Sequence, residues 1–320
     1  MQKDPPKILL AGATGYIGKA VASELARRGY TVTAVNRTAA EVPGCRSVEM
    51  PDIANREELL AGFANDRFDA VVSCIASRSG VADDAWHGEN EMNRALLAVA
   101  EQTGARRFVL LSAICVQRPR LAFQHAKLAF EAELRASTLE HAIVRPTAFF
   151  KSLSGQVSRV LAGKPFLIFG SGNETACKPI SASDLAGFIA DSIDSDSARN
   201  AILPIGGPGA AITPREQGEI LFELSGRAPR FRSVSPRIFT AVSGLLTPLG
   251  RLWPTAARKA ELARIGHYYA TESMLLWDEQ VQRYDAQKTP SYGAMTLREH
   301  YARMLRGENE DHDLGDHAIF

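Results

Sequence analysis

The feature that most constrains this 320-residue chain is a glycine-rich turn near its start, in the segment Ala11–Gly18 (AGATGYIG). The segment follows an apolar run and leads into a helical pattern, so its GxxGxxG spacing falls between a predicted strand and a predicted helix. In that setting Gly12 permits a tight turn, Gly15 lets the backbone approach a pyrophosphate, and Gly18 lets the helix pack closely on the strand. The pyrophosphate then rests on the helix N-terminus, which predicts a dinucleotide site. The other predicted contacts of this loop are Thr14, Tyr16 and Ile17.

The first half of the chain alternates short apolar runs with helical patterns, which is typical of a doubly wound α/β fold. The runs are apolar throughout, as expected for strands covered by helices on both faces. After Arg145-Pro146 the alternation stops. We therefore predict a Rossmann-type parallel sheet in a dinucleotide-binding domain, residues 1–150, and a smaller C-terminal substrate-binding lobe, residues 151–320, partly interleaved with the sheet. The predicted strands of the first half are Lys7–Leu10, Thr31–Val35, Ala70–Cys74, Phe108–Leu111 and Ala142–Val144.

The second half has weaker signals. We predict one helix near Leu153–Leu161 and strands at Phe166–Phe169 and Ala201–Ile205. Thr213 as N-cap, followed by Pro214 and then by Glu216 three residues after the cap, gives a well-defined helix start. The lobe is expected to pack on the edge of the sheet and close the substrate cleft.

Composition excludes several classes of function. The net charge of +1 creates no field to attract nucleic acid, so no such partner is expected. The four cysteines are scattered and form no CxxC pair, so no zinc, iron–sulfur or other metal site is predicted. The sequence begins without an export signal and has no apolar run of about 18 residues, which predicts a cytoplasmic protein.

The end of the second predicted strand indicates which dinucleotide binds. NAD enzymes usually place a carboxylate there for the ribose 2′-hydroxyl, whereas this chain has Arg37 and Thr38. A guanidinium can hold a 2′-phosphate with two hydrogen bonds, so we predict NADPH. Asp52, after the third strand, is predicted to hold the adenine edge. The residues that end the fourth strand and line the adenosine ribose are predicted to be Cys74, Ile75 and Ala76.

The catalytic region is incomplete by the standard of ketone-reducing short-chain dehydrogenases, in which a Tyr four residues before a Lys supplies the proton and a Ser polarises the carbonyl. Lys127 and Ser112 stand at the expected places, but Phe123 replaces the Tyr. Lys127 can still bind the nicotinamide ribose, while no phenol can protonate a carbonyl. This favours a different hydride transfer, such as reduction of a conjugated C=C bond, with His125, Cys115 or the tyrosines of the C-terminal lobe as alternative proton donors. Pro146 and Thr147, after the sixth strand, are predicted to border the nicotinamide.

These features resemble the atypical short-chain reductases that include the isoflavone-reductase-like and NmrA-like proteins. Four segments are more specific and are similar to the NADPH-dependent divinyl chlorophyllide 8-vinyl reductases, over essentially the whole chain. The resemblance implies reduction of the C8 vinyl group of a divinyl chlorophyllide or protochlorophyllide, a tetrapyrrole pigment, during chlorophyll or bacteriochlorophyll synthesis. The segments are Lys178–Ala186, Ile205–Gly209, Ala263–Leu275 and Gly315–Phe320.

A flat, apolar macrocycle with a propionate needs apolar and basic contacts. The stretch Arg227–Lys259 has seven basic residues, no acidic one, and an apolar run, Ile238–Leu252. It could cover the pigment, lie on a membrane surface as a peripheral contact, or pack on its own domain. Further candidates for substrate binding are Phe149, Phe150, His267, Tyr268 and Tyr269.

Two other functions fit the same residues. One is an isoflavone-reductase-like C=C reductase of a phenolic substrate, although the long segment after Arg264 disfavours it. The other is an NmrA-like sensor or assembly factor that binds NADPH without turnover. The retained Lys127 favours catalysis, because a sensor has less need of a cation beside the nicotinamide ribose.

Overall fold

The structure is a computed structural model that describes residues 4–77, 79–250 and 253–308. Its contacts divide the chain into two units. The first unit takes residues 1–78, 82–146 and 182–204, and the second takes 79–81, 147–181 and 205–320. Residues 182–204 thus return to the first unit after the chain has left it.

The first unit is built on a seven-stranded sheet with the order β3-β2-β1-β4-β5-β6-β8. Each neighbouring pair from β3 to β6 is parallel. The strand order reverses between β1 and β4, and doubly wound folds bind nucleotides in the crevice at the carboxyl ends of such strands. The predicted fold class is therefore confirmed. The strands are β1 (Lys7–Ala11), β2 (Thr31–Asn36), β3 (Cys45–Glu49), β4 (Ala70–Ser73), β5 (Arg107–Leu111), β6 (Glu140–Pro146) and β8 (Ala201–Ile205).

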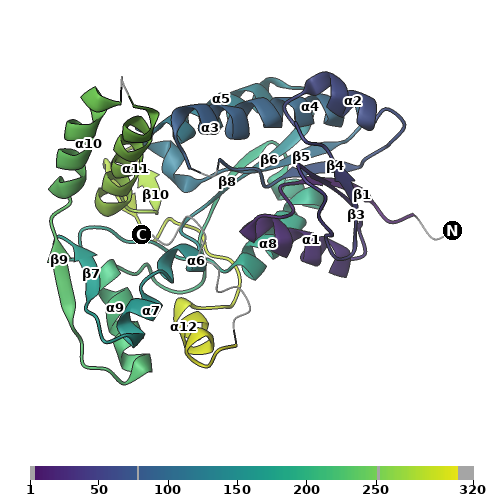
Figure 1. The fold of residues 1–320 in the computed structure, drawn as a ribbon. Helices are drawn as coiled ribbons and strands as arrows, with labels where there is room; N and C mark the ends of the chain where they lie inside the picture. The colour runs from purple at the N-terminus through teal and green to yellow at the C-terminus, as the bar shows by residue number, and fades with distance from the viewer. Residues whose placement is uncertain (1–3, 78, 251–252, 309–320) are drawn as a thin grey trace. The chain divides into compact units, whose positions relative to one another are not determined.

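Helices cover both faces of this sheet (Figure 1). α1 (Tyr16–Arg27) and α8 (Ala182–Asp194) pack together on one face. The other face carries α2 (Arg56–Gly62), α3 (Ala82–Ala85), α4 (Met92–Thr103) and α5 (Ala122–Ala136). Strands buried on both faces explain the unbroken apolar runs of the sequence. The shorter helices are the π-helix η1 (Trp86–Glu91) and the 3-10 helices η2 (Ile114–Gln117) and η3 (Asp196–Ala198).

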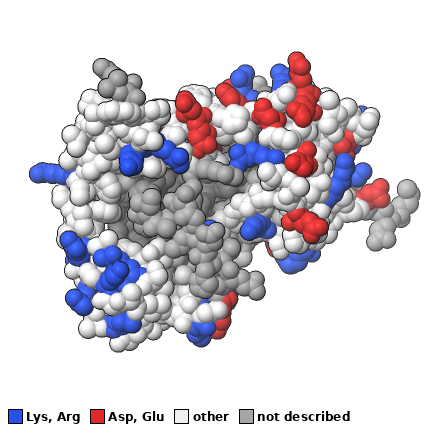
Figure 2. Space-filling view, viewed as in Figure 1, with Lys and Arg blue, Asp and Glu red and all other residues white. Residues whose placement is uncertain are grey.

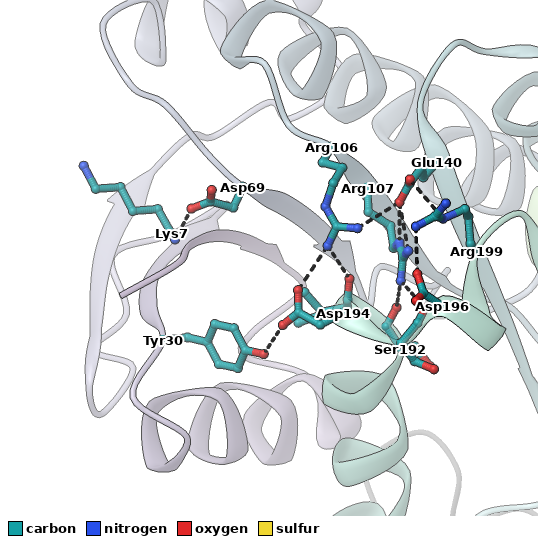
Figure 3. A network of polar contacts seen from close by, with 12 residues as sticks. Lys7, Tyr30, Asp69, Arg106, Arg107, Glu140, Ser192, Asp194, Asp196 and Arg199 are labelled. Atoms are coloured by element: carbon teal, nitrogen blue, oxygen red, sulfur yellow. Dashed lines mark hydrogen bonds and ion pairs between the residues drawn. The ribbon is translucent and has the colours of Figure 1, made fainter. Parts of the chain in front are cut away.

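A polar network ties residues 182–204 to the sheet (Figure 3). The fully buried Arg107 of β5 donates to Glu140 on β6 and, from Nη1, to the carbonyl oxygens of Ser192 at 3.0 Å and Ser195 at 2.8 Å. Its hydrogen bond lowers the pKa of the Glu140 carboxyl below its usual range. Arg106 donates to Glu140 and to Asp194. The network explains why the chain returns to the first unit there, since a buried guanidinium must be fully hydrogen-bonded.

The second unit combines short strands with helices. β7 pairs in parallel with β9, and β10 forms an antiparallel hairpin with β11. α10 and α11 pack side by side, as Figure 1 also shows. The elements are α6 (Phe150–Leu153), α7 (Val157–Leu161), β7 (Phe166–Phe169), α9 (Pro214–Ser225), β9 (Phe231–Val234), α10 (Arg237–Leu249), α11 (Pro254–Thr271), β10 (Leu276–Asp278), β11 (Arg283–Asp285) and α12 (Leu297–Leu305).

Two sequence predictions in this unit have clear outcomes. The start of α9 is confirmed: Thr213 and Glu216 form a reciprocal capping box. The single helix expected near Leu153–Leu161 is wrong, because α6 and α7 are separate. The Ser154 hydroxyl bonds the carbonyl oxygen of Phe150 at 2.8 Å and closes the first of them. Within the described ranges, no helix is long and apolar enough to span a bilayer.

Candidate cofactor and catalytic site

The glycine loop joins β1 to α1 in a turn that tolerates no side chain at two of its positions. Gly12 has φ +80°, and a Cβ there would lie 2.7 Å from the carbonyl carbon of Cys74. A Cβ on Gly18 would lie 1.9 Å from the carbonyl oxygen of Gly12. The N-cap of α1 is Gly15, which offers no side-chain cap, and the first turn holds no acidic residue. The first N–H groups of α1 are therefore available to an anion, as dinucleotide binding requires.

The other loop residues divide by exposure. Thr14 and Gly15 are exposed at the tip of the turn, and Tyr16 is half-buried. Ile17 is 6% exposed and belongs to the core, so its contribution to a cofactor would come from its backbone. The tip thus presents main-chain groups and a hydroxyl, which suit phosphate oxygens.

The end of β2 holds a polar side chain that lacks partners. Asn36 is 4% exposed, and neither its side-chain oxygen nor its nitrogen has a hydrogen-bond partner among the described residues. Buried polar groups are nearly always paired, so this amide fits a ligand that supplies the missing bonds. Sequence reasoning passed over Asn36, because the arginine after it gave the more familiar signal.

Arg37 and Thr38, which follow Asn36, are both exposed. Thr38 lines an open hollow of about 400 Å³ with Asn36, Glu41 and Glu49. Within the described parts of the chain nothing pairs with the Arg37 guanidinium. The carboxylates of Glu41 and Glu49 border the hollow and would repel a phosphate. Arg37, at the end of the same strand, is the cation that would offset this repulsion.

The remaining predicted adenosine contacts lie near strand ends. The Asp52 carboxylate accepts the backbone N–H of Ala54 at 3.0 Å, which fixes the turn after β3. Cys74 follows β4 directly, and burial raises the pKa of its thiol to about 12, an effect that the nearby Lys127 ammonium partly opposes. Ile75 is 8% exposed and Ala76 is exposed. Cys74 is therefore a neutral thiol at the crevice beside the glycine loop.

Lys127 on α5 is buried and forms an ion pair that the sequence did not reveal. Its Nζ lies 2.6 Å from Oε2 of Glu89, whose other carboxylate oxygen accepts the backbone N–H of Ser77 at 2.9 Å and the Ser77 hydroxyl at 3.2 Å. Glu89 is 3% exposed and stands on the π-helix η1. π-helical turns are frequent at functional sites. The pair holds the ammonium in place just beyond the end of β4.

A second buried cluster decides the position of Ser112. The Ser112 hydroxyl donates to Oε1 of Glu131 at 2.5 Å, and Glu131 also accepts two hydrogen bonds from Arg145. Ser112 and Glu131 are 4% and 2% exposed. The proton of the hydroxyl therefore points to a carboxylate and not toward a substrate. The polarising role that its place in the sequence suggested for Ser112 stays a prediction, and this hydrogen bond would have to break before the hydroxyl could donate to a substrate.

The structure places the other predicted catalytic and nicotinamide residues as follows. His125 is exposed on α5, whereas Lys127 two positions later is buried. Pro146 ends β6 in the first unit. Thr147 starts the second unit, where its N–H donates to the carbonyl oxygen of Ile205 at 2.9 Å and its hydroxyl donates to the carbonyl oxygen of Lys178.

The predicted substrate residues all lie in the second unit. Phe150 is 1% exposed in the apolar core and packs against His300, so it supports the fold of this unit and offers no surface of its own. Phe149 and His267 are half-buried. On α11, Tyr268 is buried, while Tyr269 is 40% exposed. The segment Gly315–Phe320, which carried part of the family resemblance, lies outside the described residues.

Besides Asn36, sequence reasoning missed Glu89 and Glu131. Glu89 precedes Lys127 by 38 positions, and their contact arises only because η1 and α5 pack on the same face of the sheet. No spacing rule connects such residues. Glu131 stands between Phe130 and Ala132 in α5, and a carboxylate in such an apolar part of a helix was the available signal, because carboxylates are rarely buried without a partner. Glu89 lies in the polar segment Trp86–Glu91 (WHGENE), which gave no such signal.

Comparison with known proteins agrees with this geometry. Residues 12–196 match the model of an NAD(P)H-binding family. A chloroplastic divinyl chlorophyllide a 8-vinyl-reductase from Zea mays is 46% identical over 331 residues, which cover 98% of this chain and 82% of the relative. The enzyme of the same name from Arabidopsis thaliana is 44% identical, covering 97% of this chain and 79% of the relative.

A solved structure of leucoanthocyanidin reductase from Vitis vinifera shares the fold. Its TM-score is 0.70 at 17% identity, and the match covers 94% of this chain and 99% of that one. The family resemblance drawn from the sequence is confirmed by the full-length relatives. The chain belongs to the divinyl chlorophyllide a 8-vinyl-reductase family of NAD(P)H-binding proteins.

Proposed function

We propose that this chain reduces the C8 vinyl group of a divinyl chlorophyllide or protochlorophyllide to ethyl with NADPH, in chlorophyll or bacteriochlorophyll synthesis. The observation that carries the proposal is its 44–46% identity, over nearly its full length, to four reductases of that name. The dinucleotide loop and the buried Lys127 give the chain the parts that such a reaction needs.

The active site suits an alkene better than a ketone. Phe123 occupies the place of the usual phenol, and the Ser112 proton is directed to Glu131. Neither residue can polarise a carbonyl while that hydrogen bond is intact. A vinyl group conjugated to a tetrapyrrole needs no such help, because the macrocycle delocalises the charge that hydride addition leaves. NADPH supplies the hydride when bound, and Lys127, held by Glu89, would bind its nicotinamide ribose and fix the ring.

One feature supports NADPH over NADH, and a second one beside it supports dinucleotide binding in general. Arg37 is exposed with no partner among the described residues, so its guanidinium is available for a 2′-phosphate. The unpaired amide of Asn36 stands beside it and would bond the adenosine ribose. We propose that His125, which is exposed, plays no part in holding the cofactor and is available as a proton donor.

The partner we propose is the pigment itself, met at a membrane surface from the cytoplasmic side, because an apolar macrocycle partitions into lipid. A sensor or assembly factor without turnover is the second candidate. A buried ion pair beside the cofactor crevice disfavours it, since desolvating two charges is costly and a site that only binds has less need of a fixed ammonium.

The test is an anaerobic assay of the purified chain with NADPH and divinyl chlorophyllide a, followed by the Soret band. We expect an NADPH-dependent blue shift, because reduction removes the vinyl group from the conjugated system. Chromatography of the product should give the 8-ethyl pigment. NADPH binding without any blue shift would move the assignment to the sensor or assembly factor.

Arg37→Ala tests the choice of cofactor. A hydrogen bond to a charged group is worth about 1.5–3 kcal/mol, so we expect the KM for NADPH to rise about ten- to a hundredfold while activity with NADH stays unchanged. Steady-state kinetics with both cofactors measure this. Arg56→Ala, which removes another exposed arginine of the same unit, is the matched control and should change neither KM. Equal losses with NADPH and NADH would exclude 2′-phosphate recognition by Arg37.

A further inference from the structure

Helix α10 presents an apolar stripe to solvent. Its exposed apolar side chains recur at spacings of four, three and four residues, which places them along one side of the helix. None of the thirteen residues of α10 is buried. In a helix that packs on its own core the apolar stripe faces inward, whereas this stripe faces solvent, and an exposed apolar surface of this kind is typical of an interaction site. The side chains and their exposed fractions are Ile238 52%, Val242 39%, Leu245 70% and Leu249 37%.

The opposite side of α10 is already occupied within the second unit. The ring centroids of Phe239 and of Phe169 on β7 lie 5.1 Å apart. The Phe239 ring also lies close to Gly266 of α11, because a Cβ on that glycine would be 2.7 Å from a carbon of the ring. Arg264 of α11 donates to the Thr247 hydroxyl at 2.8 Å. These contacts hold α10 in a fixed orientation with the apolar stripe outward.

The chain segment that contains the stripe is basic, and the nearby acidic residue of α11, Glu261, is paired with Arg264. Between Arg227 and Lys259 the sequence has seven basic residues and no acidic one. On the face shown in Figure 2, lysines and arginines gather over α7, α9 and β9 without an acidic side chain among them, close to α10, whose one charged residue is Arg237. Trp253, just before α11, is 57% exposed. Arg251 and Leu252 lie outside the described residues. The exposed basic residues are Arg227, Arg230, Arg232, Arg237, Arg258 and Lys259.

We propose that α10 lies in the interface of an anionic lipid bilayer, with its apolar stripe among the acyl chains and these basic residues at the headgroups. An apolar helix face with arginines beside it and an aromatic residue at its end is the arrangement of interfacial helices. A second copy of the chain would set the same cations against each other, which disfavours a symmetric dimer. One pigment propionate needs one cation, whereas this surface has six exposed ones.

The inference deepens the proposed function, because it names the surface through which the enzyme would reach a lipid-dissolved pigment. The test is flotation of the purified full chain with vesicles of phosphatidylcholine alone or of equal parts phosphatidylcholine and phosphatidylglycerol. We expect binding to the anionic vesicles and little to the neutral ones. Leu245→Asp should lower the partition coefficient about tenfold or more, since burying a leucine side chain accounts for at least that factor.

Val281→Asp is the matched control, because Val281 is 53% exposed in the turn of the β10–β11 hairpin and outside the basic region. It should leave vesicle binding unchanged. Arg232→Glu with Arg237→Glu should weaken binding to anionic vesicles about tenfold or more, because each basic residue near such a surface contributes about 1 kcal/mol. Circular dichroism and NADPH binding should match the wild type in all of these variants.

Several outcomes would overturn the inference. Absence of vesicle binding, or equal binding to neutral vesicles, would exclude an anionic interface. A Leu245→Asp variant that still binds vesicles but has a higher KM for pigment in their absence would assign the stripe to the substrate. A Leu245→Asp variant in which only the oligomeric mass changes would show that the stripe contacts a second copy of the chain. The reductase assay without vesicles separates these results from failure of the proposed activity.

Discussion

Replacing Lys127 with alanine should reduce turnover about a hundredfold or more and also destabilise the first unit. The activity should fall because Lys127 is the preorganised cation that we propose to bind the nicotinamide ribose, and loss of one such donor typically costs that factor. The stability falls because the Glu89 carboxylate stays buried with only the Ser77 donors, and breaking a buried ion pair costs about 3–5 kcal/mol. Steady-state kinetics and urea denaturation measure the two effects.

A double variant separates these two roles of Lys127. Lys127→Met with Glu89→Leu replaces both charges by apolar groups of similar size, which is often neutral for stability. We expect the unfolding free energy to recover while turnover stays low. Recovery of both would make the pair purely structural. Arg107→Met is the control: it breaks another buried network of the same unit and should lower stability without changing turnover per folded molecule.

The second large effect is expected at the glycine loop. Gly18→Ala puts a Cβ 1.9 Å from the carbonyl oxygen of Gly12, and its three nearest neighbours, two atoms of Gly12 and one of Ala13, are all backbone atoms that cannot rotate away. The loop must shift, and a displacement of about 1 Å in a positioning element can cost a hundredfold. We therefore expect NADPH affinity to fall by about that factor and the unfolding free energy by about 3 kcal/mol. Fluorescence titration with NADPH gives the first quantity.

Gly104→Ala provides the comparison for this variant. Gly104 ends α4 with φ +75°, and no heavy atom lies within 4 Å of its added Cβ. Alanine at this position lowers the unfolding free energy only because its backbone must stay left-handed, which costs about 1–2 kcal/mol. NADPH affinity should be unchanged. If Gly18→Ala binds NADPH as tightly as Gly104→Ala does, the loop between β1 and α1 is not the pyrophosphate site.

Local chemistry in the sequence was sufficient for much of the first unit. The strands that helices cover on both faces are continuous apolar runs, so the sheet could be read from them. The glycine loop and the Thr213–Glu216 capping box follow from rules that act over a few residues, and the structure has both. The division of Leu153–Leu161 into α6 and α7 shows where such rules weaken, because there a single hydroxyl decides where a helix ends.

The sequence by itself determined the fold class, the dinucleotide loop and the absence of the phenol four residues before Lys127. Each of these depends on residues that are neighbours along the chain. Tertiary structure alone decided that Glu89 holds Lys127, that Glu131 takes the proton of Ser112, and that the apolar side of α10 faces solvent. Those pairs come from different elements, and which side of an amphipathic helix is covered depends on what packs against it. Such contacts form only when the sheet and helices assemble, so no local pattern records them.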